Sequence, residues 1–558
     1  MKDFSLPNTP ARHIFLVVFV ITLFGMASCN RHKQEQQARQ FPQRDITIDS
    51  TTAFNKRFLD SAQVESFIKT GQLDSVTANN LRAFYNSRNY QFAWFDDKSL
   101  NEQGLTFWNL VSNYIHISKD SSLFNRSLNA TMSEILDDSL SKISPQRLAQ
   151  TDLALTRQFF VYAQTAYAGK LEPADLQWFI PRKKIDALAL LDSLIARKGD
   201  NIEMWEPVNP MYQALRKKLV QYDSISDRGG WDSIRMDPKK KYSPGDSSPV
   251  IKQVKARLAI TGIFHISDTS YRYDSSLVAV VKESQRSFGL RDNGVIDREL
   301  VSKLNVPIKA RIEQMLINLE RMRWLPEKSD SNRIVVNIPE FVLHVFENNK
   351  QVIQMKIVVG KEGTSTVIFN DNLKYIVFSP YWNVPRSIVR NEIAPALKRN
   401  KNYLSRNHME ITGNSGGLPI VRQLPGPWNS LGRVKFLFPN NFNIYFHDTP
   451  AKSLFSRDNR AFSHGCIRLS EPEELANYLL RDNPEWTPQK IKEAMMLGKE
   501  KWVTLKTPVP VYISYYTSWV GPNGMLNFRD DIYDHDKEMA EHLFTNSQLS
   551  KEEEKAKN

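Results

Sequence analysis

The sequence predicts an α+β protein of several domains, in which helical domains precede a β-rich domain with a long insertion. At 558 residues the chain is long enough for three or four domains of ordinary size. Apolar residues recur with the period of a helix as far as about Trp231, and from Arg333 they alternate with a period of two. We therefore expect the chain to change from α to β at about residue 333.

The composition excludes several classes of protein. Hydrophobic residues at 41% and charged residues at 24% are typical of soluble globular proteins, and two cysteines exclude a disulfide scaffold or a cysteine-rich zinc site. The formal net charge of +13 favours a polyanionic partner. Nucleic acid, an anionic membrane and an acidic polymer all meet that description, and the charge alone does not choose among them.

Residues 1–29 have the pattern of a signal peptide. A basic segment precedes an apolar run from Ile14 to Met26, which is shorter than the ~20 residues that a membrane-spanning helix needs. The run ends at Cys29 in a pattern that resembles a bacterial lipobox, whose cysteine is lipidated. The alternative is an ordinary secreted protein that discards Cys29 with its signal. Residues 30–50 are polar and predict a flexible tether.

Residues 51–242 are predicted to form a helical scaffold domain. Leu155, Phe159 and Tyr162 lie on one face of a helix. The stretch from Phe84 to Trp94 is rich in aromatic residues, and we interpret it as core, because aromatic residues at such spacing usually pack together and seldom hold a cofactor.

Residues 243–308 are predicted to form a separate three-helix unit. Ser248 has the position of an N-cap before a proline, and the turn at Asp292-Asn293-Gly294 precedes the third helix. The pattern around Gln285 and this turn is similar to the peptidoglycan-binding domain of wall hydrolases and wall-modifying enzymes. The alternative is an unrelated three-helix bundle. A linker helix is expected within residues 309–332.

Residues 333–520 are predicted to form the β-rich domain. Alternating apolar residues predict its strands, and Glu347-Asn-Asn-Lys350 predicts a hairpin turn. Residues of about 385–439 are rich in loops and predict a functional insertion such as a lid. Within it we interpret Gly416-Gly417 as a hinge. The charged residues 521–558 predict a disordered C-terminal tail.

One cysteine is the candidate nucleophile. If Cys29 is lipidated, Cys466 is the remaining thiol, and it lies in the sequence Ser463-His464-Gly465-Cys466-Ile467-Arg468. A predicted strand ends at His447, and a cysteine with a histidine elsewhere is the minimal nucleophile–base pair for acyl transfer. His447 and His464 compete for the role of base. The alternative is a buried structural cysteine with satisfied histidines.

The block from His447 to Arg468 resembles the signature of the YkuD-type L,D-transpeptidase catalytic domain. The similarity extends to a large, lid-bearing bacterial subgroup and covers nearly the whole mature chain. Asp448 departs from the many smaller members that have glycine there. The segments that carry the wider resemblance are Asn383-Val384-Pro385, Arg422–Pro427, Asn429–Asn440, His447–Pro450, Val509–Ile513 and Phe528–Tyr533.

The resemblance implies catalytic roles for several residues of this block. Cys466 is expected to attack a peptidoglycan tetrapeptide stem and His447 to act as general acid and base. Backbone N–H groups near His464 and Gly465 are expected to stabilise the oxyanion, and the backbone carbonyl of Asp448 to orient His447. Thioester aminolysis by the side-chain amine of a second stem then forms a 3→3 cross-link.

The resemblance also implies substrate-binding residues. Tyr445 lies two residues before His447, so both occupy one strand face, where Tyr445 is expected to contact the stem. Ser463 is expected to hold the loop or the histidine. Arg468 is expected to bind a stem carboxylate or to form a structural ion pair, and Trp382 to line the donor groove or to lie in the core.

The resemblance implies no cofactor and no metal, and the ten histidines contain no HExxH motif. The expected partners are peptidoglycan stem peptides, the membrane through an N-terminal lipid, and carbapenem-type β-lactams as inhibitors, without nucleic acid. The expected location is the periplasm or cell envelope. Two alternatives to the transpeptidase remain, a cysteine-dependent carboxypeptidase or endopeptidase and a non-catalytic wall-binding scaffold.

Overall fold

The computed structural model describes residues 44–49, 55–138, 140–202, 206–262 and 270–544. The predicted signal peptide, Cys29 and most of the tether lie outside these residues. The chain divides into two compact units. The first takes the described residues up to Asn109 together with Asn125–Val161 and Ala187–Asp200, and the second takes the rest. Among the described residues, we find no helix with the length and apolar character needed to cross a membrane.

The first unit is helical, and its core contains the predicted aromatic stretch. Tyr85 and Trp94 are fully buried, and the Tyr85 hydroxyl donates to the carboxylate of Asp152 at 2.7 Å. The indole of Trp94 donates to Thr156 at 2.8 Å, so the interpretation of these aromatics as core is confirmed. The helices that form or enter this unit are α2 (Ser61–Thr70), α3 (Ser75–Ser87), α4 (Glu102–Ser118), α5 (Arg126–Asp138), α6 (Pro145–Ala163) and α7 (Ala187–Ala196).

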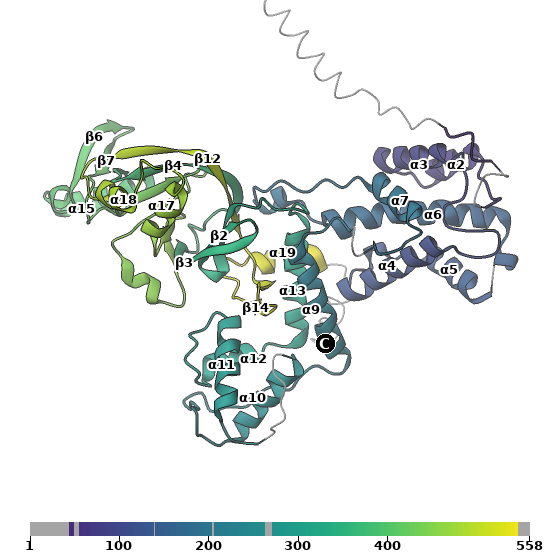
Figure 1. The fold of residues 1–558 in the computed structure, drawn as a ribbon, viewed down its shortest axis with the longest axis horizontal. Coiled ribbons are helices and arrows are strands. Elements are labelled where there is room, and N and C mark those ends of the chain that lie inside the picture. The colour runs from purple at the N-terminus through teal and green to yellow at the C-terminus, as the bar shows by residue number, and fades with distance from the viewer. Residues whose placement is uncertain (1–43, 50–54, 139, 203–205, 263–269, 545–558) are drawn as a thin grey trace, which may run out of the picture. The chain divides into compact units, whose positions relative to one another are not determined.

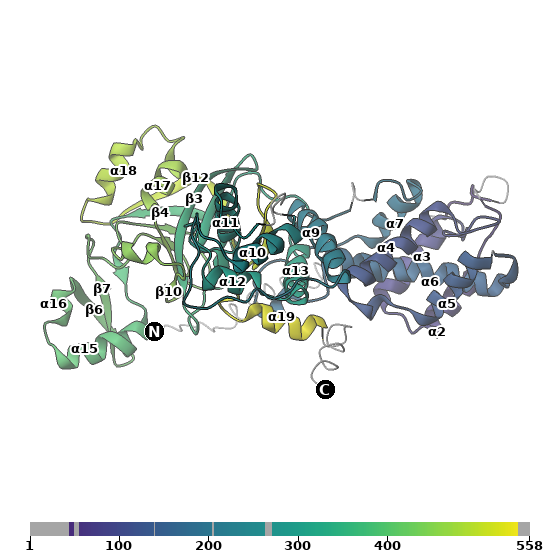
Figure 2. The same cartoon turned by 90° about the horizontal axis from the view of Figure 1, so that it is seen from below.

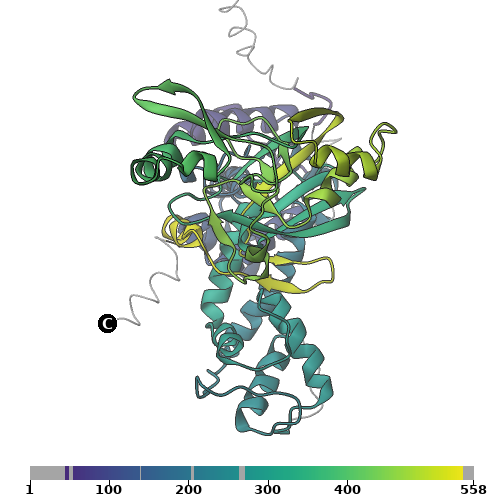
Figure 3. The same cartoon turned by 90° about the vertical axis from the view of Figure 1, so that its left-hand side faces the viewer.

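The second unit contains the predicted three-helix bundle, seen as the teal group at the bottom of Figure 3. Its described helices are α10 (Pro249–Ile260), α11 (Ser275–Ser287) and α12 (Arg298–Leu304). Ser248 caps α10, as predicted, by accepting the N–H of Val250. The side chain of Gln285 bonds Asn293 and the N–H of Gly294, both at 2.9 Å, and so holds the predicted turn.

Two long helices of the second unit lie side by side. They are α9 (Pro210–Asp227) and α13 (Ile308–Arg323), and Figure 1 shows their contact. The sequence assigns α9 to the scaffold domain at 51–242, whereas the structure places it in the second unit. In this unit α9 packs against α13.

The described residues of the β-rich region form a nine-stranded sheet in the order β10-β3-β11-β9-β8-β4-β12-β1-β2. The predicted hairpin joins β2 to β3, and Asn348 and Asn349 have φ of 50° and 62°, as a two-residue hairpin turn requires. The strands are β1 (Arg333–Asn337), β2 (Val342–Glu347), β3 (Lys350–Gly360), β4 (Phe369–Phe378), β8 (Val434–Leu437), β9 (Phe446–His447), β10 (Ala461–Ser463), β11 (Ile467–Leu469) and β12 (Lys501–Ser514).

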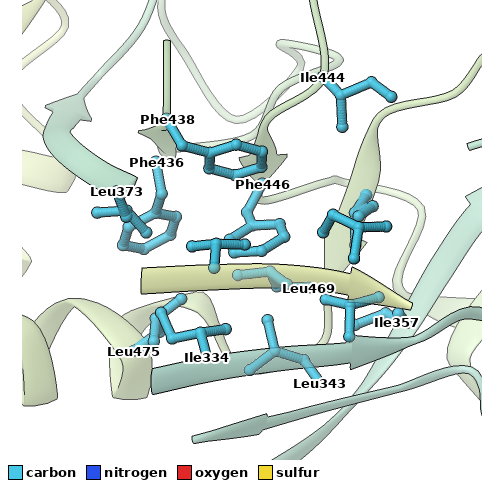
Figure 4. Close-up of a cluster of buried hydrophobic side chains, with 14 of the residues drawn as sticks. Ile334, Leu343, Ile357, Leu373, Phe436, Phe438, Ile444, Phe446, Leu469 and Leu475 are labelled. Atoms are coloured by element: carbon cyan, nitrogen blue, oxygen red, sulfur yellow. The ribbon is translucent and has the colours of Figure 1, made fainter. Parts of the chain in front are cut away.

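One face of this sheet is covered by apolar side chains. Figure 4 shows Phe436, Phe446 and Leu469 meeting side chains of β1, β2 and β3, and Leu475 joins them from α17 (Pro472–Leu480). A second helix, α18 (Pro488–Met495), adds Ile491 to the cluster. Burying each such side chain contributes roughly 1.5–3 kcal/mol, so the register of the strands is strongly specified.

The predicted insertion leaves the main sheet and forms a small structure of its own, the lid. All residues of its three-stranded sheet β5-β7-β6 are described. Figure 2 shows β6, β7, α15 and α16 grouped together. The lid has its own apolar cluster of Val384, Val389, Ile393 and Val421. Its elements are β5 (Trp382–Asn383), α14 (Arg386–Ile388), the π-helix η6 (Val389–Ile393), α15 (Ala394–Arg399), α16 (Tyr403–Arg406), β6 (Met409–Ser415) and β7 (Leu418–Gln423).

Two details of the predicted insertion differ in the structure. Gly416 and Gly417 have φ of 55° and 73° and form the turn of the β6–β7 hairpin, so their interpretation as a hinge is wrong. The predicted end of the insertion at residue 439 is too late, because β8 already pairs with β4 in the main sheet. The alternating apolar residues at 434–438 lie within a stretch that is otherwise rich in loop-forming residues, so the pattern of the whole stretch did not indicate a strand there.

The prediction of a disordered tail is wrong for residues 521–544. β13 (Ser518–Val520) pairs with β14 (Leu526–Phe528), and α19 (His535–Phe544) follows. Asp536 on α19 accepts from the guanidinium of Arg321 at 2.5 Å, and the side chain of Arg321 is fully buried. The charges of this segment therefore pair with a buried arginine of α13, a partner that lies more than two hundred residues away in the sequence. Residues 545–558 lie outside the described residues.

Candidate active site

Two short parallel strands bring the predicted catalytic residues together. β9 and β11 pair with His447 opposite Arg468 and Phe446 opposite Ile467. Residues that are paired across a sheet point to the same face, and successive residues point to opposite faces. Phe446 and Ile467 are fully buried in the apolar core. His447 and Arg468 consequently lie on the other face of the sheet.

Tyr445 and Cys466 extend this polar face by one pair. The rings of Tyr445 and His447 lie 5.8 Å apart, as the alternation predicts. The N–H of Ile467 donates to the carbonyl of Tyr445 at 3.1 Å, which places Cys466 beside Tyr445. The thiol is half-buried, whereas the side chain of His447 is only 4% exposed. The structure therefore unites residues that are about twenty positions apart in the sequence.

The neighbouring backbone determines the tautomer of His447. Its Nδ1 lies 2.5 Å from the carbonyl oxygen of Asp448. A carbonyl can only accept, so Nδ1 carries the proton and Nε2 keeps a lone pair. Burial and the positive charge of Arg468 lower the pKa of His447 from 6.5 to about 3. The imidazole is thus neutral at physiological pH, and its Nε2 is free to accept a proton.

The side chain of Asp448 anchors this carbonyl. Its carboxylate accepts the N–H of Arg433 and the ammonium of Lys452, both at 2.8 Å. Gly432 lies so close that a Cβ there would be 2.3 Å from the carboxylate. The aspartate after His447 therefore has a positional role, and no motif in the sequence indicates its partners Arg433 and Lys452.

The resting state of Cys466 is a neutral thiol. Its Sγ donates to the carbonyl of Asn443 at 3.4 Å. Burial raises the pKa of the thiol, while hydrogen bonding to Tyr445 and the charge of Arg468 act in the opposite direction. Because His447 is also neutral, Cys466 and His447 do not form a thiolate–imidazolium ion pair at rest. Asn443 was not among the predicted site residues, because a backbone acceptor leaves no signature in the sequence.

The loop before Cys466 is held by Ser463. The Ser463 hydroxyl donates to the carbonyl of Cys466 at 2.6 Å and accepts the N–H of Gly465 at 3.2 Å. Ser463 is 2% exposed, and of the two roles expected for its side chain these contacts favour holding the loop. The N–H of Gly465 thus donates to Ser463 in this structure, and the role of the backbone N–H groups near His464 and Gly465 in stabilising an oxyanion stays a prediction. Gly465 has a φ of 107°, a conformation that favours glycine.

A second layer fixes the loop from behind. The buried hydroxyl of Thr366 donates to the carbonyl of Gly465 at 2.9 Å and accepts the N–H of Gly360 at 3.0 Å. The Tyr533 hydroxyl donates to the carbonyl of Gly360. Thr366 was not among the predicted site residues, and the structure joins it to the loop that carries Cys466.

Arg468 supplies an available positive charge at the site. Its Nε is buried without a hydrogen-bond partner, and among the described residues no carboxylate lies within ion-pair distance of it. Of the two predicted roles for Arg468, the structural ion pair is therefore not observed. The arrangement favours recognition of an anionic group of a ligand.

Two predicted residues belong to the lid side of the site. His464 is about half-exposed, and its Nε2 lies 3.5 Å from a carboxylate oxygen of Glu392 on η6. It therefore faces the lid, which favours His447 over His464 as the base. Trp382 packs against the apolar cluster of the lid, so of its two predicted roles the structure favours the core of that small domain.

A group that could bind a metal ion lies outside this site. Within the described ranges, His116, Asp223 and Asp227 bring their ligand atoms within 4.8 Å of one another. Asp223 is already paired with the ammonium of Lys119 at 2.9 Å and with His116 at 3.1 Å. These residues lie on or beside α4 and α9, so they have no part in the chemistry at Cys466.

Comparison with known families assigns three parts of the chain. The family model of the L,D-transpeptidase catalytic domain, YkuD, matches residues 331–511. The Scaffold domain model matches residues 79–219, and that of the "Putative peptidoglycan binding domain" matches residues 247–304. The chain therefore carries an L,D-transpeptidase catalytic domain together with a Scaffold and a peptidoglycan-binding domain, and the resemblance and α+β multidomain fold predicted from the sequence are confirmed.

Individual proteins are also similar to parts of this chain. A Haemophilus influenzae protein described as "Putative L,D-transpeptidase" is 29% identical over 243 residues, which cover 41% of this chain and 49% of that protein. The chain thus spans about half the length of this curated relative. A solved L,D-transpeptidase from Mycobacterium smegmatis is 14% identical, with 33% of this chain and 58% of that chain covered and a TM-score of 0.19. L,D-transpeptidase 1 from Mycobacterium tuberculosis is 15% identical, with 34% and 63% covered and a TM-score of 0.16.

Proposed function

We propose that this protein is a peptidoglycan L,D-transpeptidase that forms 3→3 cross-links through a thioester on Cys466. The observation that carries the proposal is the pairing of the strands that bear Cys466 and His447 on the polar face of the sheet, within the matched catalytic domain. The fixed tautomer of His447 supplies a base of the correct form. The half-buried thiol remains open to a ligand.

The first half-reaction acylates the enzyme. Nε2 of His447 takes the proton of the Cys466 thiol as the sulfur attacks the carbonyl of the third residue of a tetrapeptide stem. The C–S bond forms, the C–N bond to the terminal D-alanine breaks, and the protonated His447 returns its proton to the departing amine. Since the resting pair is neutral, the proton moves during attack and not before it.

The second half-reaction transfers the acyl group. The side-chain amine of another stem attacks the thioester, the C–S bond breaks and an amide forms. The amine proton passes to the thiolate of Cys466 by way of His447, which restores the neutral pair. Backbone N–H groups next to the thiol stabilise the oxyanion of both steps, and each such donor is worth about 10²–10³ in rate in other acyl-transfer enzymes.

Features around the site support a wall substrate. The unpaired Arg468 is suited to a carboxylate of the stem peptide. The domain matched at residues 247–304 is suited to holding the polymer, and the net charge of +13 is suited to an anionic one. Carbapenem-type β-lactams are expected to acylate the same thiol.

The most direct test of function is product analysis. Purified tetrapeptide muropeptides are incubated with the wild-type protein, and the products are identified by mass. The proposal predicts 3→3 dimers and released D-alanine in equal amounts, and no products with Cys466→Ala. Tripeptide without dimers would instead identify a carboxypeptidase, and loss of existing cross-links an endopeptidase. Undiminished turnover by Cys466→Ala would refute the assignment of the nucleophile.

We propose further that the protein is a lipoprotein of the cell envelope, anchored through Cys29. The support is the apolar run and the small residues that precede Cys29. Cys29→Ser should leave the membrane fraction or remain at the length of the precursor. Unchanged membrane association of the variant would contradict the anchor.

A further inference from the structure

The lid is strongly basic, and its acidic residues are few. Between Pro385 and Gln423 the chain has seven basic residues and only two acidic ones, Glu392 and Glu410. An amine acceptor is positively charged near neutral pH, because the side-chain amine of a diamino acid ionises like that of lysine. The positive charge of most of the lid therefore disfavours the approach of an ammonium group. The basic residues are Arg386, Arg390, Lys398, Arg399, Lys401, Arg406 and Arg422.

The two lid carboxylates differ in their partners. Glu410 accepts from the guanidinium of Arg422 at 2.5 Å, so its charge is neutralised within the lid. Among the described residues, no lysine or arginine pairs with Glu392. Its contact is with Nε2 of His464, at 3.5 Å across the junction between lid and catalytic loop. Glu392 is thus the one lid carboxylate whose charge faces the site.

The lid core determines where Glu392 points. It lies on the π-helical turn η6, a form of helix that is frequent at functional sites. Its neighbours Val389 and Ile393 are 2% and 1% exposed and are anchored in the lid cluster. The side chain of Glu392 is 55% exposed on the opposite side. Because His464 lies two residues before Cys466, its contact with Glu392 places the exposed side of η6 near the nucleophile.

We propose that Glu392 forms the binding subsite for the protonated primary amine of the acceptor. The ammonium replaces His464 as the partner of the carboxylate and is held beside the loop that carries Cys466. It gives one proton to the solvent before its nitrogen attacks the thioester. No group is transferred at this subsite. The inference rests on the proposed function, because a thioester must exist before an acceptor amine can matter.

The test measures binding of the acceptor separately from binding of the donor. The full-length protein is given saturating tetrapeptide donor and varied tripeptide stem with a free side-chain amine. A pair of half-exposed charges of this kind typically contributes a few-fold in affinity. Glu392→Gln should raise the acceptor KM about two- to fivefold, whereas thioester formation and its hydrolysis by water should change less than twofold. Glu392→Asp should restore most of the acceptor affinity.

Three controls isolate the charge of Glu392. Glu410→Gln removes the other lid carboxylate and should leave the acceptor KM unchanged, which separates the subsite from a general effect on the lid. The same tripeptide with its amine acetylated, used as an inhibitor, should bind the wild type and Glu392→Gln equally. Added salt should raise the wild-type KM more than that of Glu392→Gln, since ions screen the exposed carboxylate.

The outcomes distinguish this proposal from the proposed function. If the wild type forms no thioester, the proposed function fails. If thioester and dimers form but Glu392→Gln keeps the wild-type acceptor KM, the subsite is refuted while the transpeptidase stands. If Glu410→Gln raises the KM as much as Glu392→Gln does, net lid charge and not this subsite governs the acceptor, and the proposal is equally refuted.

Discussion

The buried imidazole of His447 should make the catalytic unit sensitive to acid. Its pKa is about 3 in the folded protein and 6.5 in the unfolded chain. Above pH 6.5 neither state binds the proton, so His447 does not affect the pH dependence there. Below pH 6.5 the unfolded chain binds a proton that the folded protein rejects, so the free energy of unfolding falls as the pH falls towards 3. The gap corresponds to roughly 5 kcal/mol in total, of which about 2.7 kcal/mol is lost by pH 4.5.

The perturbation that isolates this effect is His447→Gln, which does not titrate. Wild type and variant, both with Cys29→Ser, are unfolded in urea at pH 7.5 and 4.5. Exposure of Cys466 to a thiol reagent that reacts at acid pH then reports the unit that contains the site. The fall in unfolding free energy should be about 2–3 kcal/mol smaller in the variant, because the other titrating groups contribute equally to both proteins. An equal fall in both would show that His447 is protonated in the folded state, and the neutral resting pair would be wrong.

Three further changes test other parts of the structure. Replacing the lid from Pro385 to Gln423 by a short linker should shift products from 3→3 dimers to hydrolysed tripeptide, because closed lids exclude water. Loss of acylation by small β-lactams would show instead that the segment is part of the catalytic fold. Gly465→Ala should lower the acylation rate and destabilise the fold by about 1–3 kcal/mol, because alanine is strained at a φ of 107° even though its Cβ meets only ordinary contacts at 3.7 Å. An unchanged rate would show that the loop tolerates a side chain. Arg321→Met should destabilise the protein by about 3–5 kcal/mol and release α19 to proteases, with partial recovery on adding Asp536→Leu; a stable single variant would show that α19 docks without this pair.

Local patterns in the sequence predict the parts of the fold that depend on local interactions. The N-cap at Ser248, the hairpin turn at Asn348-Asn349 and the alternating strands follow from short segments, and the structure contains all of them. The predictions that failed depend on distant partners. The charges of α19 indicate disorder until Arg321 is known to be buried beside them.

The same distinction applies to the site. Cys466 and His447 have a motif, and alternation alone places Tyr445 beside His447. Lys452, Asn443 and Glu392 have none, since their contacts are made across the fold or through the backbone. The burial that makes His447 neutral likewise depends on the packing of the whole sheet.

The central claim, that Cys466 is acylated with His447 as its base, is tested most directly by intact-protein mass measurement. Wild type, Cys466→Ala, His447→Ala and His464→Ala are mixed with a carbapenem and sampled over time. The structure predicts one covalent adduct on the wild type, none on Cys466→Ala, a much slower adduct on His447→Ala and a nearly normal rate on His464→Ala. An adduct on Cys466→Ala, or a slower rate for His464→Ala than for His447→Ala, would contradict the account.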